Sequence, residues 1–230
     1  MNFLAAYYVF LIGVFIPVIC VRSYFRLKAG ARFPNKKALR IQTIMIHGIL
    51  FFFAWMVCRA LGQQVFPPYE IQWKHLVVGF GILLGFVSTM YGLWKSNAVE
   101  KRERVYRNAP QSPDEMPGWI AVSISAGFAE EIAYRGVLFG ILMYWIHNWW
   151  VAALLCAIAF ALGHAIQGWK SALYIFAMSV IFQWFVFFTG TLYLAMAVHA
   201  LYDVIAGFAY LRLYRQTAPE VSASAPSSVV

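Results

Sequence analysis

Repeated apolar runs of about 20 residues constrain this chain more than any other feature of its sequence. A run of that length is what an α-helix needs to cross a lipid bilayer. Of the 230 residues, 62% are hydrophobic and only 12% are charged, whereas about a quarter of a soluble domain is charged. The sequence therefore predicts an all-α polytopic membrane helix bundle.

Seven runs are predicted to be membrane spans: Phe3–Val21, Ile41–Val57, Leu76–Trp94, Trp119–Trp145, Trp149–Ile166, Ser171–Phe188 and Thr191–Leu211. Pro17 predicts a kink in the first span. A separate interfacial helix near Met116–Ala126 would raise the number of helices to eight. We expect one membrane domain with three parts: an N-terminal three-span region (1–118), a core that carries the chemistry (119–215) and a disordered tail (216–230).

The net charge of +9 comes mostly from two loops and does not indicate a nucleic-acid-binding surface. Seven of the 18 Lys and Arg residues lie between Arg22 and Arg40, and five more lie between Lys95 and Arg107. Loops with this excess of basic residues face the cytoplasm. The distribution predicts that the N-terminus lies outside and the C-terminus inside. The three cysteines are widely spaced and predict no disulfide framework.

Six titratable residues fall inside predicted spans, where charge is costly and usually marks a functional site. All six lie in the C-terminal half of the chain: Glu130, Glu131, Arg135, His164, His199 and Asp203. The other three histidines, His47, His75 and His147, lie at or near predicted span ends. An interfacial role is sufficient to explain each of them.

Helical geometry divides this set into pairs. Glu131 and Arg135 are four residues apart and can pair on one face of a helix. Glu130 is rotated by about 100° from Glu131, so Glu130 can face a cavity while Glu131 pairs with Arg135. His199 and Asp203 also share a face, and a carboxylate can fix the tautomer of a histidine. We expect the six residues to meet in a cavity that opens toward the cytoplasmic half.

A glutamate in an apolar pocket can act as a general base, and histidines can hold a water, donate to an oxyanion or bind zinc. The function common to these roles is hydrolysis by an activated water. Two alternatives remain open at this stage. The charges can form a buried ion-pair network that only locks helices together, or His164 and His199 can ligate a haem.

Three motifs on these spans resemble those of the CPBP family of intramembrane endopeptidases, the CAAX-prenyl-protease and bacteriocin-processing (Abi) group. The family's EExxxR motif matches Glu130–Arg135, FxxxH matches Phe160–His164 and Hxxx(N/D) matches His199–Asp203. The resemblance covers about residues 119–211. It implies a helical membrane fold and cleavage of a peptide bond near the terminus of a membrane-associated protein or peptide. It also implies a location in the bacterial cytoplasmic membrane.

By this resemblance, Glu130 would activate the water, His164 and His199 would position it, and Asp203 would orient His199. Glu131 and Arg135 would support the site. The prenyl-protease branch has Asn where this chain has Asp203. The motifs leave open whether zinc is needed or whether the glutamate and the histidines suffice. If zinc is used, its ligands would be Glu130, His164 and His199, but the lack of an HExxH motif favours a metal-independent site. The alternative function is a non-catalytic membrane scaffold or immunity-type protein.

Overall fold

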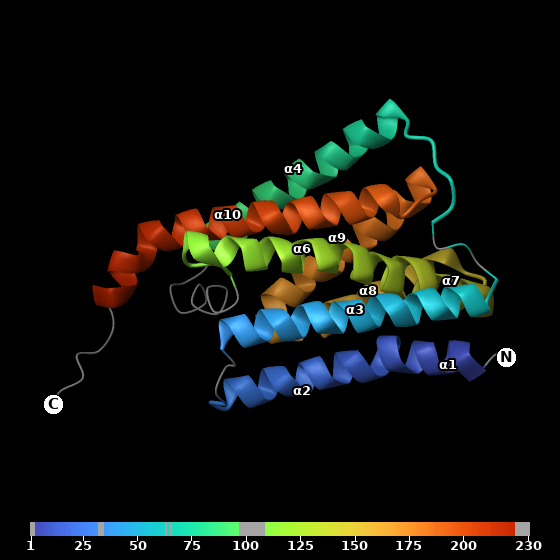
Figure 1. Cartoon of the computed structure of the whole chain (residues 1–230), viewed down its shortest axis with the longest axis horizontal. Helices are drawn as coiled ribbons and strands as arrows, with labels where there is room; N and C mark the ends of the chain where they lie inside the picture. The colour runs from blue at the N-terminus through green and yellow to red at the C-terminus, as the bar shows by residue number, and fades with distance from the viewer. Residues whose placement is uncertain (1–2, 32–34, 63, 65, 97–108, 224–230) are drawn as a thin grey trace.

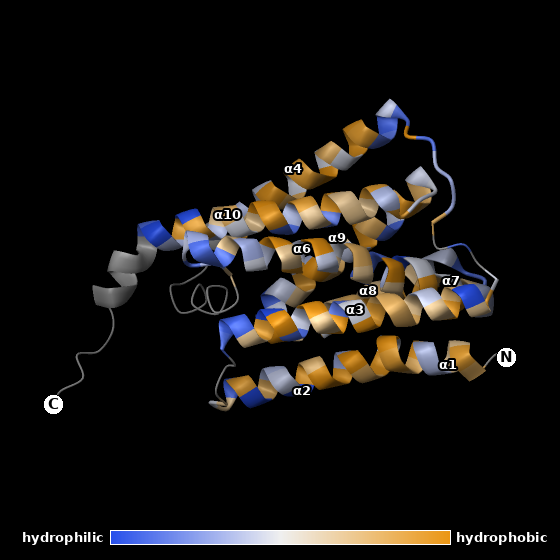
Figure 2. Ribbon diagram, in the orientation of Figure 1, coloured by the Kyte–Doolittle hydropathy of each residue, from blue (hydrophilic) through white to orange (hydrophobic). Residues whose placement is uncertain are grey.

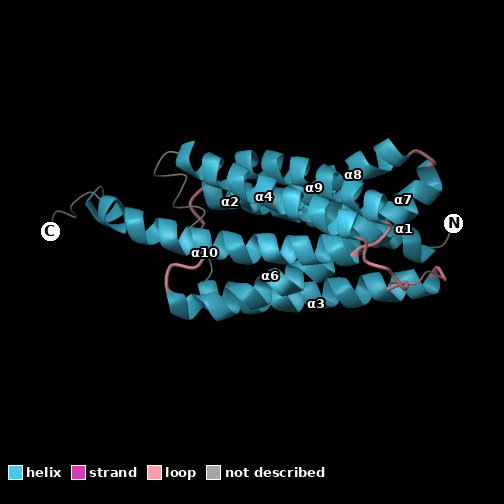
Figure 3. Cartoon of the chain, turned by 90° about the horizontal axis from the view of Figure 1, so that it is seen from above, coloured by secondary structure: helices cyan, strands magenta, loops and turns pink. Residues whose placement is uncertain are grey.

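The computed structural model describes residues 3–31, 35–62, 64, 66–96 and 109–223 of the chain (Figure 1). Every regular element in these residues is helical, which confirms the all-α prediction (Figure 3). The α-helices are α1 (Phe3–Phe10), α2 (Ile16–Lys28), α3 (Lys36–Ala60), α4 (Trp73–Ser96), α6 (Met116–Glu130), α7 (Phe139–Ile146), α8 (Trp149–Gly163), α9 (Trp169–Thr189) and α10 (Tyr193–Ala223). The π-helices are η1 (Leu11–Phe15) and η3 (Glu131–Leu138), and the 3₁₀-helices are η2 (Pro113–Glu115) and η4 (Ala165–Gln167).

Two sets of these elements form continuous rods. The first joins α1, η1 and α2, and the second joins α6, η3 and α7, because the residues at each junction keep right-handed helical dihedrals. The described residues therefore form seven long helical rods, as predicted. The segment Met116–Ala126 belongs to the same rod as the two glutamates, so it is not the separate interfacial helix that would have made eight.

The rods run along the long axis of the molecule, and the two termini lie at opposite ends (Figures 1 and 3). Five rods are long and apolar enough to cross a membrane, and α8 is a shorter apolar helix. In the rod from Met116 to Ile146, the run of apolar residues is interrupted by the charged residues Glu130, Glu131 and Arg135, although the helix itself is continuous. An odd number of rods agrees with termini on opposite sides, although which terminus is outside stays a prediction.

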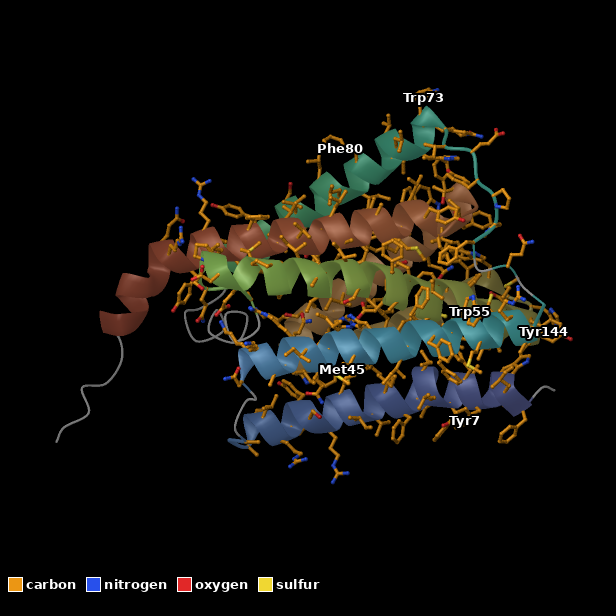
Figure 4. All side chains as sticks on the ribbon, viewed as in Figure 1. Tyr7, Met45, Trp55, Trp73, Phe80 and Tyr144 are labelled. Atoms are coloured by element: carbon orange, nitrogen blue, oxygen red, sulfur yellow. The ribbon has the colours of Figure 1, made fainter. Side chains whose placement is uncertain are left out.

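Hydrophobic residues occupy most of the length of the helices (Figure 2). Large side chains on several helices point away from the bundle and are exposed, including Tyr7, Met45, Trp55, Trp73, Phe80 and Tyr144 (Figure 4). Exposure of this much apolar surface would be a liability in water. In a bilayer it faces lipid, so the chain is an integral membrane protein.

Close packing of α10 against α6 positions the C-terminal motifs. A Cβ atom on Gly127 would lie 2.8 Å from the Met196 carbonyl oxygen and 2.9 Å from the Ala200 Cβ atom, so only glycine allows this approach. Further along, the Trp119 indole covers Gly207 and donates a hydrogen bond from Nε1 to the Asp203 carbonyl oxygen at 2.8 Å. These two contacts bracket His199 on α10. The opposite partner of α6 is α3.

The structure adds detail at the kink predicted for Pro17 and moves several helix boundaries. Pro17 directly follows the π-helix η1 inside a continuous rod, and the wider turn accommodates a residue without an N–H. Helix α8 ends at Gly163 instead of Ile166. Helix α10 continues to Ala223, so the predicted tail is helical over residues 216–223. Residues 224–230, and residues 97–108 of the predicted basic loop, lie outside the described residues.

Candidate active site

A cavity of about 870 Å³ enters the bundle between α2, α3, α6, α8, α9 and α10. Its polar lining is divided by charge. Basic side chains line it where α2 ends, where α3 begins and where α9 begins: Arg26, Lys36, Arg40 and Lys170. Within the bundle, the lining includes Glu130, His164, His199 and Asp203. The cavity therefore joins a basic end of the protein to the predicted site.

Glu130 and Glu131 point in different directions, because adjacent side chains on a helix are rotated by about 100° from each other. Glu130 is the last residue of α6 and lines the cavity, and Glu131 is the first residue of the π-helix η3. The Glu130 side chain is 13% exposed, whereas that of Glu131 is fully buried. This is the division between a cavity-facing carboxylate and a supporting carboxylate that the sequence predicts.

Three imidazole rings surround the Glu130 carboxylate. The Nε2 atom of His47 lies 3.3 Å from Oε1 of Glu130. The Nε2 atoms of His164 and His199 lie 3.9 Å and 3.8 Å from the other oxygen, Oε2. The sequence predicted the two histidines on the Oε2 side but not His47.

The opposite nitrogen of each ring is held by a hydrogen bond. His164 donates from Nδ1 to the Phe160 carbonyl oxygen at 2.8 Å, and His199 donates from Nδ1 to Oε1 of Glu131 at 2.8 Å. A carbonyl and a carboxylate can only accept, which places a proton on Nδ1 in both rings. The Nε2 atoms of these two rings are therefore directed at Glu130, where a water or a substrate carbonyl would lie.

Glu131 joins His199 to Arg135. The Nη1 atom of Arg135 lies 3.2 Å from Oε1 of Glu131, one helical turn away, and both side chains are buried. Arg135 also donates from Nη2 to the Ser179 hydroxyl at 3.0 Å. Its guanidinium stacks on the Phe160 ring, with Cζ 4.1 Å from the ring centre. Arg135 is thereby held on three sides, and it fixes the carboxylate that contacts His199.

Asp203 does not occupy the place that the sequence predicted for it. Its Oδ2 atom lies 3.7 Å from Nε2 of His199, on the cavity side of the ring. The nitrogen that sets the tautomer, Nδ1, is bonded to Glu131 instead. Asp203 is one turn further along the same helix and reaches only the near edge of the ring, whereas Glu131 comes from the facing rod.

His47 is the residue that reasoning from the sequence missed. It was assigned to a span end, but α3 begins at Lys36, which places His47 three turns inside a helix. It is 7% exposed, and its Nδ1 atom lies 2.9 Å from the Ser125 hydroxyl. The criterion that selected the other histidines, a titratable group at bilayer depth, would have selected His47 if the helix start had been placed correctly.

The donor atoms around Glu130 are of kinds that zinc accepts, namely imidazole nitrogen and carboxylate oxygen. Within the described part of the chain, however, no three His, Cys, Asp or Glu side chains are arranged to hold one ion. No step of the chemistry is therefore assigned to a metal.

One family model matches the chain. It is described as type II CAAX prenyl endopeptidase Rce1-like, and it covers residues 112–205. This region contains all three motifs and the six predicted site residues, and excludes α3 with His47. The match confirms the resemblance seen in the sequence. Comparison with curated proteins and with solved structures found no significant match.

Proposed function

We propose that this chain hydrolyses a peptide bond with a water activated by Glu130, because residues 112–205 match the model of the Rce1-like type II CAAX prenyl endopeptidases. One observation carries the proposal. The Glu130 carboxylate lies in a cavity within the bundle, and the Nε2 atoms of two motif histidines are within 4 Å of one of its oxygens. A packing role alone would not require an open cavity at this carboxylate.

In the proposed reaction, the Glu130 carboxylate takes a proton from a water in the cavity, and the resulting hydroxide attacks the peptide carbonyl carbon. Negative charge then develops on the carbonyl oxygen. A protonated Nε2 of His164 or His199 donates to that oxygen. When the C–N bond breaks, Glu130 returns its proton to the leaving amine. The products are a carboxylic acid and an amine, and Glu130 is again a carboxylate.

His199 acts in this scheme with its ring held by Glu131, and Glu131 is held by Arg135. This chain of contacts fixes the ring so that Nε2 faces the cavity. Preorganised donors of this kind are worth about 10²–10³ in kcat when one is removed. Asp203, beside the same Nε2 atom, can accept a hydrogen bond from the water or from the substrate.

The proposed substrate is a membrane-associated protein or peptide cleaved near its C-terminus. Two features support this. The exposed apolar surface keeps the enzyme in the bilayer with its substrate, and the basic end of the cavity is complementary to a free terminal carboxylate. A substrate peptide with a C-terminal amide should therefore be cleaved with a higher KM than the same peptide with a free carboxylate. We further propose that the enzyme lies in a bacterial cytoplasmic membrane with its C-terminus inside.

The decisive experiment compares peptide ends in membranes that contain the wild-type chain or the Glu130→Gln variant. Glutamine keeps the size of the side chain but cannot accept the water proton. Peptide ends that depend on the wild-type chain should disappear with Glu130→Gln while the protein remains inserted at the same level. Glu70→Gln, at an exposed loop residue, is the matched control and should cleave normally. Cleavage retained by Glu130→Gln would rule out the mechanism.

A further inference from the structure

The contact between His47 and Glu130 joins the motif region to a helix that the family model does not cover. From this contact we infer that His47 is a positioning residue, which holds the Glu130 carboxylate in the orientation that accepts a proton from water. The inference rests on the proposed function, since it assigns His47 a part in the same reaction.

The two oxygens of Glu130 face different partners. Oε2 faces His164 and His199 at 3.9 Å and 3.8 Å, and all three residues line the cavity. Oε1 faces only His47 among these histidines, at the shorter distance of 3.3 Å. A carboxylate held at one oxygen cannot rotate freely about its last bond. His47 therefore directs Oε2, the oxygen nearest to the two motif histidines, toward the place where water would be activated.

The orientation of the His47 ring is itself fixed. The Ser125 hydroxyl lies 2.9 Å from Nδ1 of His47 and can donate to it, which leaves the ring proton on Nε2, the nitrogen that faces Oε1 of Glu130. Ser125 lies on α6, the helix that ends in Glu130. The ring is thus held at both nitrogens by residues of α6 that are five positions apart, and this fixes the direction of its Nε2 atom.

His47 is buried, so both nitrogens of its ring need hydrogen-bonding partners within the protein. His47 is 7% exposed and lies where α3 packs along α6. A buried imidazole without partners would be costly, and both of its nitrogens have partners here, one of which is Glu130. An ordinary packing position in a membrane helix would be filled by an apolar residue.

The test uses two replacements of His47 that are both compatible with a helix. Leucine fills a similar volume and offers no donor, while the glutamine amide can place an N–H near the position of Nε2. We expect His47→Leu to lower kcat by about 10- to 100-fold, the range for a misplaced reacting group, with KM changed less than about twofold. His47→Gln should recover most of the lost kcat.

The matched control is His75→Gln. His75 is also a buried histidine on a membrane helix, but its partner is the Tyr69 hydroxyl and it does not line the cavity. This variant should keep the wild-type kcat. Ser125→Ala, which removes the partner of Nδ1, should give a kcat between those of His47→Leu and the wild type.

Equal kcat values for His47→Leu and His47→Gln, or a loss that appears in KM alone, would overturn the inference. Its failure is distinguishable from failure of the proposed function. If Glu130→Gln is inactive while His47→Leu cleaves at the wild-type rate, only the role of His47 is wrong. If Glu130→Gln still cleaves, the proposed function itself is wrong.

Discussion

His199 donates its Nδ1 proton to Oε1 of Glu131 at 2.8 Å, and the same oxygen lies 3.2 Å from Nη1 of Arg135. One oxygen atom of a fully buried carboxylate thus connects His199, in the third motif, to Arg135, the last residue of the first motif. A buried charge that loses its partner is strongly destabilising, whereas loss of the whole pair is often tolerated. Stability and activity should therefore respond differently when the two partners are replaced.

Glu131→Gln should lower the free energy of unfolding by about 3–5 kcal/mol, because it leaves the buried Arg135 cation without its counter-charge. It should also lower kcat by about 10- to 100-fold, the usual effect of removing a residue that orients a histidine. The double variant Glu131→Gln/Arg135→Met should regain much of the stability but not the activity. Unfolding in detergent and cleavage assays measure the two effects, and a double variant no more stable than the single one would contradict the pairing.

Gly127→Ala should separate α6 from α10, because the added Cβ would lie 2.8 Å from a backbone carbonyl oxygen that cannot move aside. Overpacking of this kind costs about 1–3 kcal/mol, and kcat should fall because His199 and Glu130 lie on the two separated helices. Gly81→Ala is the matched control, since nothing lies within 4 Å of its added Cβ. That control should be as stable as the wild type or slightly more stable.

Removal of divalent metals should leave cleavage unchanged, because no step in the proposed reaction uses a metal. The measurement is kcat before and after dialysis against a zinc-selective chelator. A loss of activity that added zinc restores would instead favour the zinc ligand set Glu130, His164 and His199.

Glu115 should stabilise the protein at neutral pH but not in acid. Burial by itself would raise the pKa of Glu115, but hydrogen bonds from Arg40 and the Gln111 N–H, with the charge of Lys36, lower that pKa below its ordinary value. A carboxylate with a lowered pKa contributes stability that is complete above its unfolded pKa of about 4.3 and is lost as pH falls through the folded pKa.

The comparison to make is therefore between the wild type and Glu115→Gln as a function of pH. The wild type should unfold at a higher temperature at pH 6–8, and the difference should shrink below about pH 4. Glu70→Gln, which replaces an exposed carboxylate, should show a much smaller difference at every pH. A constant advantage of the wild type over Glu115→Gln down to pH 3 would argue against this role.

Local spacing was sufficient to predict the rods and the central part of the site. Glu131 and Arg135 pair one turn apart as expected, and Glu130 turns away from them into a cavity with His164 and His199. Periodicity within a helix and the cost of charge in a bilayer determine these relationships. Both are readable from a single sequence.

Contacts between helices were not predictable in the same way. Asp203 shares a helix with His199, so spacing favoured it as the orienting carboxylate, yet Glu131 from the facing rod makes that hydrogen bond. His47 was passed over because its helix begins five residues before the apolar run that predicted it. The π-helix η3 begins at Glu131, and none of its residue types predicts the wider turn.

The π-helix has a further consequence through its backbone. The Tyr8 hydroxyl, on α1, donates to the Ala133 carbonyl oxygen inside η3 at 3.1 Å, and Tyr8 is fully buried. Helix α1 thus supports the motif from behind, as α3 does from the side through His47. Residues 112–205 are consequently not structurally independent of the rest of the chain. If they were placed in another helical bundle, all three motifs would remain, but the contacts from Tyr8 and His47 would be lost.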